Sequence, residues 1–284
     1  MKQLILLITL MMPGLQRTDS LDVVFWNVEN FFDWHTGNGP EGWSAGRFYR
    51  KCEGVAKTIL KIADSRGRLA DAVGLAEVEN SFVLRRLVDA TALCKLDYGI
   101  VHFDSPDHRG IDCALLYRKS SLRLLKAAPK HLYDSTGAVM ATRDILCAEF
   151  AGAGGDTLAV LVNHHPSQIG GKTEGRNIAA ARLRHVTDSL QRAGVPRTLA
   201  VGDFNEDRWG NGGPGTIKYN GAWEKIDGHF ALGFTSVEET VFDDPSLSEP
   251  DKAFGGTKPR RTFIGPRYNG GVSDHYPIVV TVYF

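Results

Sequence analysis

The stretch Thr198–Trp209, TLAVGDFNEDRW, limits the possible folds of this chain more than any other part of it. An apolar run typical of a buried strand stops at Gly202, and Asp203 and Asn205 follow at once. In layered α/β proteins, ligands bind at the carboxyl edge of such strands. Carboxylate and amide oxygens suit Mg²⁺ or Ca²⁺ better than Zn²⁺. An ordinary polar turn has the same composition, so the ends of the other strands must decide between a site and a turn.

Two earlier apolar runs also carry a polar residue near their end. Leu21–Asn27 ends in Asn27, which is either the start of an aromatic-anchored loop or a ligand oriented like Asp203. Ala72–Val78 carries Glu77, and a carboxylate inside an apolar run is costly unless it is paired, bound to metal or able to reach water. We interpret Glu77 as a metal ligand, because no basic residue lies near it in the sequence.

Histidines follow or precede two more strands. Thr157–Asn163 runs into His164 and His165, and adjacent strand residues face opposite sides of a sheet. One of the two is therefore expected to donate to a phosphate oxygen and the other to be structural. Asp274 and His275 precede the final strand, where they either belong to a functional site or form an ordinary turn with a structural histidine. The polar residues that collect at strand ends are Asn27, Glu77, His164, Asp203, Asn205, Asp227, Asp274 and His275.

Three basic residues are candidates for holding a substrate phosphate. Arg109 lies just before the strand Ile111–Tyr117, where it either pairs with Asp112 or meets a phosphate. Lys172 and Arg176 lie near the start of a helix expected from Ile178, and helix N-termini assist anion binding.

Helical periodicity and capping residues predict two further helices. Arg47–Ile62 has an apolar face, with basic residues on the other face that are either solvated or near phosphates. Ser81 is expected to cap a helix over Phe82–Leu93. Val237–Pro259 reads as irregular and acidic.

Composition narrows the functional classes. The 33 Lys+Arg balance the 33 Asp+Glu, so no overall positive field attracts nucleic acid, although a local basic patch remains open. Lys2 and the apolar run Leu4–Met12 predict an export signal over residues 1–19, too short to span a bilayer, and a periplasmic or secreted protein without a transmembrane anchor. The four cysteines have neither zinc-site nor disulfide-framework spacing.

Strands and helices alternate in two similar halves, 21–150 and 157–284, which predicts two packed sheets with helices outside. Because both halves supply candidate site residues, residues 20–284 are expected to form one domain. The site has oxygen ligands and histidines but no Ser or Cys nucleophile elbow, which favours metal-assisted attack of water on a phosphate ester.

The chain resembles the endonuclease/exonuclease/phosphatase superfamily, the DNase I-like phosphoesterases. The matching motifs occur in the family's order: WNVEN at 26–30, AEVEN at 76–80, NHHPS at 163–167, GDFNE at 202–206, WEKID at 223–227 and SDHYP at 273–277. The resemblance implies a four-layered α/β sandwich, with two mostly antiparallel sheets flanked by helices. It also implies dependence on Mg²⁺ or Mn²⁺.

The resemblance further implies a role for each site residue. Glu77 is the principal metal ligand, helped by Asn27 and Asp274. Asp203 and Asn205 position the attacking water and the phosphate. His275, oriented by Asp227, is the acid/base group, and His164 donates to a non-bridging oxygen.

Three functions remain open at this stage. The first is hydrolysis of a phosphodiester, in nucleic acid or a phospholipid head group. The second is a phosphomonoesterase acting on a small metabolite or sugar, and the third is a catalytically silent binding module. The sequence indicates no obligate protein partner.

Overall fold

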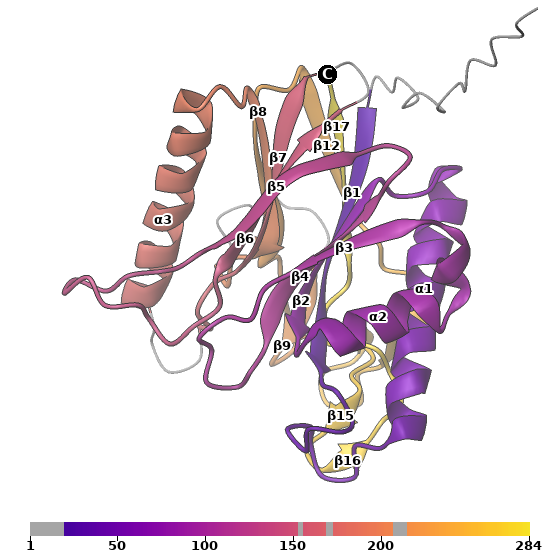
Figure 1. Ribbon diagram of the computed structural model, residues 1–284. Helices are drawn as coiled ribbons and strands as arrows, with labels where there is room; N and C mark the ends of the chain where they lie inside the picture. The colour runs from indigo at the N-terminus through magenta and orange to yellow at the C-terminus, as the bar shows by residue number, and fades with distance from the viewer. Residues whose placement is uncertain (1–19, 153–155, 169–172, 207–214) are drawn as a thin grey trace, which may run out of the picture.

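The computed structural model describes residues 20–152, 156–168, 173–206 and 215–284 of the chain. Within these residues, two large β-sheets pack face to face, and helices cover their outer surfaces (Figure 1). The arrangement is the predicted four-layered α/β sandwich.

The first sheet has the strand order β12-β17-β1-β2-β4-β3. Only β1 and β2 run parallel within it, and its other neighbours are antiparallel. Its strands are β1 (Ser20–Phe31), β2 (Ala72–Val78), β3 (Tyr98–His102), β4 (Asp112–Arg118), β12 (Ser236–Val241) and β17 (Ile278–Tyr283).

The second sheet has the order β11-β8-β7-β6-β5, with β7 and β8 as its parallel pair. Its strands are β5 (Arg123–Lys130), β6 (Ile145–Ala151), β7 (Thr157–His164), β8 (Arg197–Asp203) and β11 (Asp227–Leu232). Shorter, separate two-stranded ladders are formed by the pairs β9 (Ile217–Tyr219) and β10 (Ala222–Glu224), β13 (Ser248–Pro250) and β14 (Thr257–Pro259), and β15 (Phe263–Ile264) and β16 (Arg267–Tyr268).

Side chains alternate between the two faces of each strand, and the molecule therefore has three apolar layers. In β1, Val24 and Trp26 face α1 (Ala45–Arg66) and α2 (Ser81–Asp89), whereas Val23 and Phe25 face the second sheet. The third apolar layer lies between the second sheet and α3 (Thr173–Arg192), which Figure 1 shows on the opposite side of the molecule from α1. Each sheet is thus buried on both faces, which explains why its central strands are almost continuously apolar.

The two predicted sheets are present, and each of them takes strands from both halves of the sequence. The last strand pairs with the first, with Leu21 opposite Val282, and β12 extends the same sheet. In return, β5 and β6 from the first half join the second sheet.

Several local predictions also need correction. Residues 237–259 are not irregular, because β12, β13 and β14 and the 3₁₀ turn η2 (Pro245–Leu247) lie there. The cap of α2 is Asn80 and not Ser81: its side chain accepts hydrogen bonds from the amides of Phe82 and Val83 at 2.9 and 3.1 Å. That helix ends at Asp89, and a 3₁₀ turn, η1 (Ala92–Lys95), follows it.

The predicted export signal at residues 1–19 lies outside the described part of the chain. Among the helices that the structure describes, none combines the length and apolarity needed to cross a membrane.

Candidate active site

Strand ends from both sheets meet at one edge of the sandwich. In the second sheet, Asp203 at the end of β8 is the register partner of His164 on β7 and of Asp227 on β11. Asn27 of β1, in the other sheet, donates from Nδ2 to Asp203 Oδ2 at 3.1 Å. The parallel and antiparallel pairings therefore place side chains from distant segments within hydrogen-bonding distance of one another.

Backbone irregularities aim two of these side chains. Glu77 has φ 66°, in the left-handed region, at the point where the pairing of β2 with β4 shifts register. Asn205 has φ 54°, just beyond the end of β8. A non-glycine residue in this conformation costs about 1–3 kcal/mol, and such residues cluster at functional sites. Bulges of this kind redirect a side chain out of the regular alternation.

His275 and Asp227 form the hydrogen bond that the sequence predicted. Nδ1 of His275 lies 2.8 Å from Asp227 Oδ2, and both side chains are buried. The main chain around His275 is fixed as well, because its amide donates to Ser273 Oγ and its carbonyl accepts from Trp26 Nε1. Ring and backbone are thus both held, and Nε2 is directed toward Asp203, with Oδ2 at 4.0 Å.

His164 points into the same site, whereas its neighbour does not. Nε2 of His164 lies 3.6 Å from Asp203 Oδ2 and 3.9 Å from Glu77 Oε1. The ring of His165 instead meets Phe204 edge-on on the other face of the sheet, at 5.0 Å. The two side chains thus lie on opposite faces of the sheet, as expected for adjacent residues of a strand.

Burial and neighbouring charges separate the protonation of these groups. Burial lowers the pKa of His275, but Asp227 and the other nearby carboxylates outweigh it and raise the pKa well above its usual value. Burial, and then the charge of Asp227, raises the pKa of Asp203 to about 7. Burial and the positive charge of Arg143 hold the pKa of His164 well below its usual value, so this imidazole is neutral near pH 7.

The carboxylates around the site form a donor set suited to a hard divalent cation. Glu77 Oε2 accepts from the amide of Asn30 at 2.8 Å, while Oε1 lies 3.4 Å from Arg109 Nη2. Asp203, Asp227 and His275 offer ligand atoms within 4.8 Å of one another. The buried Oδ1 of Asp227 has no hydrogen-bond partner in the described part of the chain. Carboxylate and amide oxygens of this kind fit Mg²⁺ or Mn²⁺.

Comparison with known proteins identifies the family to which this arrangement belongs. The model of the endonuclease/exonuclease/phosphatase family matches residues 22–214 and 211–283, nearly all of the described chain. The chain belongs to the endonuclease/exonuclease/phosphatase family. Members of this family are phosphoester hydrolases that depend on divalent metal ions.

Solved structures agree with this assignment at the level of the fold. A mannosyl-6-phosphatase from Bacteroides thetaiotaomicron is 18% identical, with a TM-score of 0.60 over 93% of this chain and 100% of that one. The human Nocturnin catalytic domain with bound sulfate is 17% identical, with a TM-score of 0.59 over 94% of this chain and 95% of that one. Truncated TDP2 from Caenorhabditis elegans is 19% identical, with a TM-score of 0.58 over 93% of this chain and 98% of that one. Among curated protein sequences, none matches the chain.

Arg109 lies beside Glu77 in the candidate active site, and it does not form an ion pair with its sequence neighbour Asp112. Asp112 instead contacts His102 Nε2 at 3.0 Å and accepts from the amide of Ser105. The side chain of Arg109 is 39% exposed, and its guanidinium lies beside Glu77, which therefore does have a basic partner from a distant part of the chain. This exposure leaves Arg109 accessible to a substrate.

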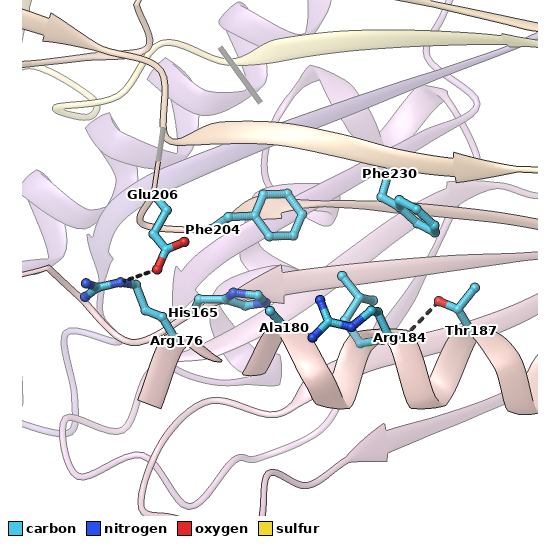
Figure 2. Close-up of a pocket in the computed structure, with 9 residues that line it drawn as sticks. His165, Arg176, Ala180, Arg184, Thr187, Phe204, Glu206 and Phe230 are labelled. Carbon is cyan, nitrogen blue, oxygen red and sulfur yellow. Dashed lines mark hydrogen bonds and ion pairs between the residues drawn. The ribbon is translucent and has the colours of Figure 1, made fainter. Parts of the chain in front are cut away.

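Arg176 occupies a different environment from Arg109. Its side chain is buried, and it donates from Nε to Glu206 Oε1 at 3.0 Å and from Nη1 to the carbonyl of Ser167 at 3.1 Å. Figure 2 shows this ion pair at one end of a cavity of about 320 Å³ that Phe204 and Phe230 help to line. With these contacts Arg176 ties the start of α3 to the segment after β8. Lys172, the other basic candidate from this region, lies outside the described residues.

Lys51, Glu29 and Arg261 lie beside the site. The sequence placed Lys51 on the basic face of its helix, either solvated or near phosphates, and this was wrong because its side chain is buried. Glu29 and Arg261 were not singled out as site residues. Burial lowers the pKa of Lys51 to about 8. Glu29 accepts from Arg261 Nε at 2.9 Å, and Arg261 Nη2 lies 3.0 Å from Asp274 Oδ2. The position of Lys51 four residues before Val55 was a usable signal, because this spacing places it on the apolar face of α1.

Proposed function

We propose that this chain hydrolyses a phosphodiester by metal-assisted attack of water, with Mg²⁺ or Mn²⁺ as the cofactor. The observation that carries the proposal is the convergence of the buried His275–Asp227 pair, His164 and Asp203 on one point beside Glu77. A catalytically silent binding module would have no need of a buried, oriented histidine beside a carboxylate whose pKa is raised to about 7.

Each side chain has a distinct task in this reaction. Asp203 accepts a proton from the attacking water, because a group with a pKa near 7 is an efficient base at neutral pH. His275 is protonated at that pH and donates from Nε2, while Asp227 fixes Nδ1. His164 donates as a neutral imidazole from Nε2 to a non-bridging oxygen, and Asn205 orients the phosphate.

Glu77 would hold the metal ion, with Asn27 and Asp274 as further ligands. When bound, the ion would supply positive charge at the phosphate oxygens, where negative charge increases in the transition state. Arg109, on the exposed side of Glu77, would bind another phosphate oxygen.

Charge favours a diester over a monoester. In the described part of the site, the guanidinium groups of Arg109 and Arg261 both lie beside carboxylates. Because Arg109 would bind one phosphate oxygen and Arg261 is held between Glu29 and Asp274, little further positive charge in the described part of the site is left for the second negative charge of a monoester. The alternative, a monoesterase for a phosphorylated sugar, is supported by the similarity in fold to a mannosyl-6-phosphatase.

The partner of the protein under this proposal is the phosphate ester itself, including nucleic acid or a phospholipid head group. We also propose that the protein is exported, on the basis of the basic and apolar pattern at residues 1–19. Fractionation of cells that express the full chain, compared with a variant lacking those residues, would test export.

A substrate panel tests the choice between the two ester classes. We expect kcat/KM for bis(p-nitrophenyl) phosphate to exceed that for p-nitrophenyl phosphate in the presence of Mg²⁺, with the same order for natural diesters and monoesters. Preference for the monoesters would support the alternative. No turnover of either class by protein with bound metal would instead support the binding module.

A further inference from the structure

A lysine lies buried beneath the candidate metal site. Lys51, on the inner face of α1, is 2% exposed, and its ammonium donates to the backbone carbonyl of Glu29. It also donates to Thr262 Oγ1 at 2.8 Å. Both of these partners are neutral oxygens. Burial of a charged group is energetically unfavourable, so the burial of this ammonium group must be offset by what its hydrogen bonds hold in place.

The first contact fixes a strained turn that orients Glu77. Glu29 and Asn30 have φ values of 48° and 49°, so two consecutive non-glycine residues adopt the left-handed conformation. Lys51 binds the carbonyl between them. With the turn in this form, the amide of Asn30 donates to Glu77 Oε2 at 2.8 Å. Such backbone conformations persist only where surrounding contacts hold them.

The second contact fixes the segment that orients Asp274. Thr262 accepts from Lys51 and donates from Oγ1 to the carbonyl of Val272 at 3.1 Å, and its amide donates to Glu29 Oε2 at 2.8 Å. The preceding residue, Arg261, bridges Glu29 Oε1 and Asp274 Oδ2. One ammonium group thus joins α1 to the two segments whose neighbouring residues, Asn30 and Arg261, contact Glu77 and Asp274.

We infer that Lys51 is a positioning residue of the metal site, which holds Glu77 through the Glu29–Asn30 turn and Asp274 through Thr262 and Arg261. The inference rests on the proposed function, because it takes Glu77 and Asp274 as metal ligands. Groups that orient metal ligands typically contribute about 10- to 100-fold to metal affinity.

Charge and positioning have opposite effects on affinity in this case. Loss of the positive charge of Lys51 would, by itself, strengthen the binding of a divalent cation nearby. Loss of the two hydrogen bonds would weaken binding by releasing the ligands. Weaker binding in Lys51→Met can therefore come only from lost positioning.

The experiment measures Mn²⁺ binding directly, by calorimetry and by the paramagnetic resonance signal of free Mn²⁺, without any substrate. We expect Lys51→Met to raise the Kd by about 10- to 100-fold. Thr262→Val leaves the charge unchanged and should shift the Kd in the same direction. Lys57→Met, on the exposed face of the same helix, should leave it unchanged.

Different outcomes separate the inference from the proposed function. An unchanged or lower Kd in a folded Lys51→Met protein would overturn the inference alone. If that variant does not fold, Thr262→Val decides the question, and wild-type affinity in it would be equally fatal. A wild-type protein that binds no Mn²⁺ would overturn the metal proposal and the inference with it.

Discussion

Replacement of Asp227 by asparagine should slow hydrolysis by about 10²- to 10⁴-fold while the fold is retained. The 2.8 Å bond to His275 Nδ1 joins a carboxylate to an imidazole that is protonated at neutral pH. Hydrogen bonds to charged groups contribute roughly 1.5–3 kcal/mol, or about 10- to 100-fold in rate. An amide can also donate to Nδ1 and so stabilise the wrong tautomer, which in a comparable buried pair costs about 10⁴-fold.

The assay is single-turnover hydrolysis of bis(p-nitrophenyl) phosphate by the wild type, Asp227→Asn, His275→Ala and the double variant. Because the two residues act as a unit, the double variant should be little slower than the slower single variant. Small, additive rate losses accompanied by a lower Tm would refute this reasoning. They would mean that Asp227 only supports its turn, where its amide meets Thr216 Oγ1, and that His275 only packs.

The same pair predicts a pH dependence of stability. The pKa of His275 is raised in the folded state, so the resulting stabilisation is fully present below the unfolded pKa of about 6.5. It is lost as the pH rises through the folded pKa. The Tm advantage of the wild type over Asp227→Asn should therefore shrink at alkaline pH, and an advantage that grows with pH would contradict the assignment.

Four further predictions concern the metal ligand, the two arginines and the domain organisation. Glu77→Gln should abolish Mg²⁺-dependent turnover with an unchanged circular dichroism spectrum, and full activity at low Mg²⁺ would remove Glu77 from the metal role. Arg109→Ala should raise KM with little change in Tm. Arg176→Ala should lower stability by about 1.5–3 kcal/mol in urea titrations, because the charged hydrogen bond to Glu206 is lost. Limited proteolysis should not yield two separately folded halves, and two such stable fragments would refute the single domain.

The strand ends could be predicted from sequence because their signal is local. An apolar run followed at once by Asp203 and Asn205 identifies both the strand and its functional edge. The hydrogen bond between His275 and Asp227 could not be predicted from the local pattern of apolar and polar residues alone. It was expected from the family motifs and from the need of a catalytic imidazole for a fixed ring nitrogen.

Pairing between distant segments could not be predicted in the same way. β12, with the sequence SVEETV, is an edge strand in which Glu238 is exposed and Glu239 pairs with Lys225 and His229, so its composition resembles that of a loop. Its place beside β17 depends on partners that no local pattern indicates. The same limit applies to Lys51 and Arg176, because their roles depend on contacts with Glu29 and Glu206, far away in the chain.

Metal dependence of turnover tests the central claim most directly. Wild-type protein would be assayed on bis(p-nitrophenyl) phosphate with Mg²⁺, after removal of the metal by EDTA, and again after Mg²⁺ or Mn²⁺ is returned. The account predicts loss of hydrolysis on metal removal and recovery on its return. Hydrolysis that persists at the same rate in EDTA would contradict it.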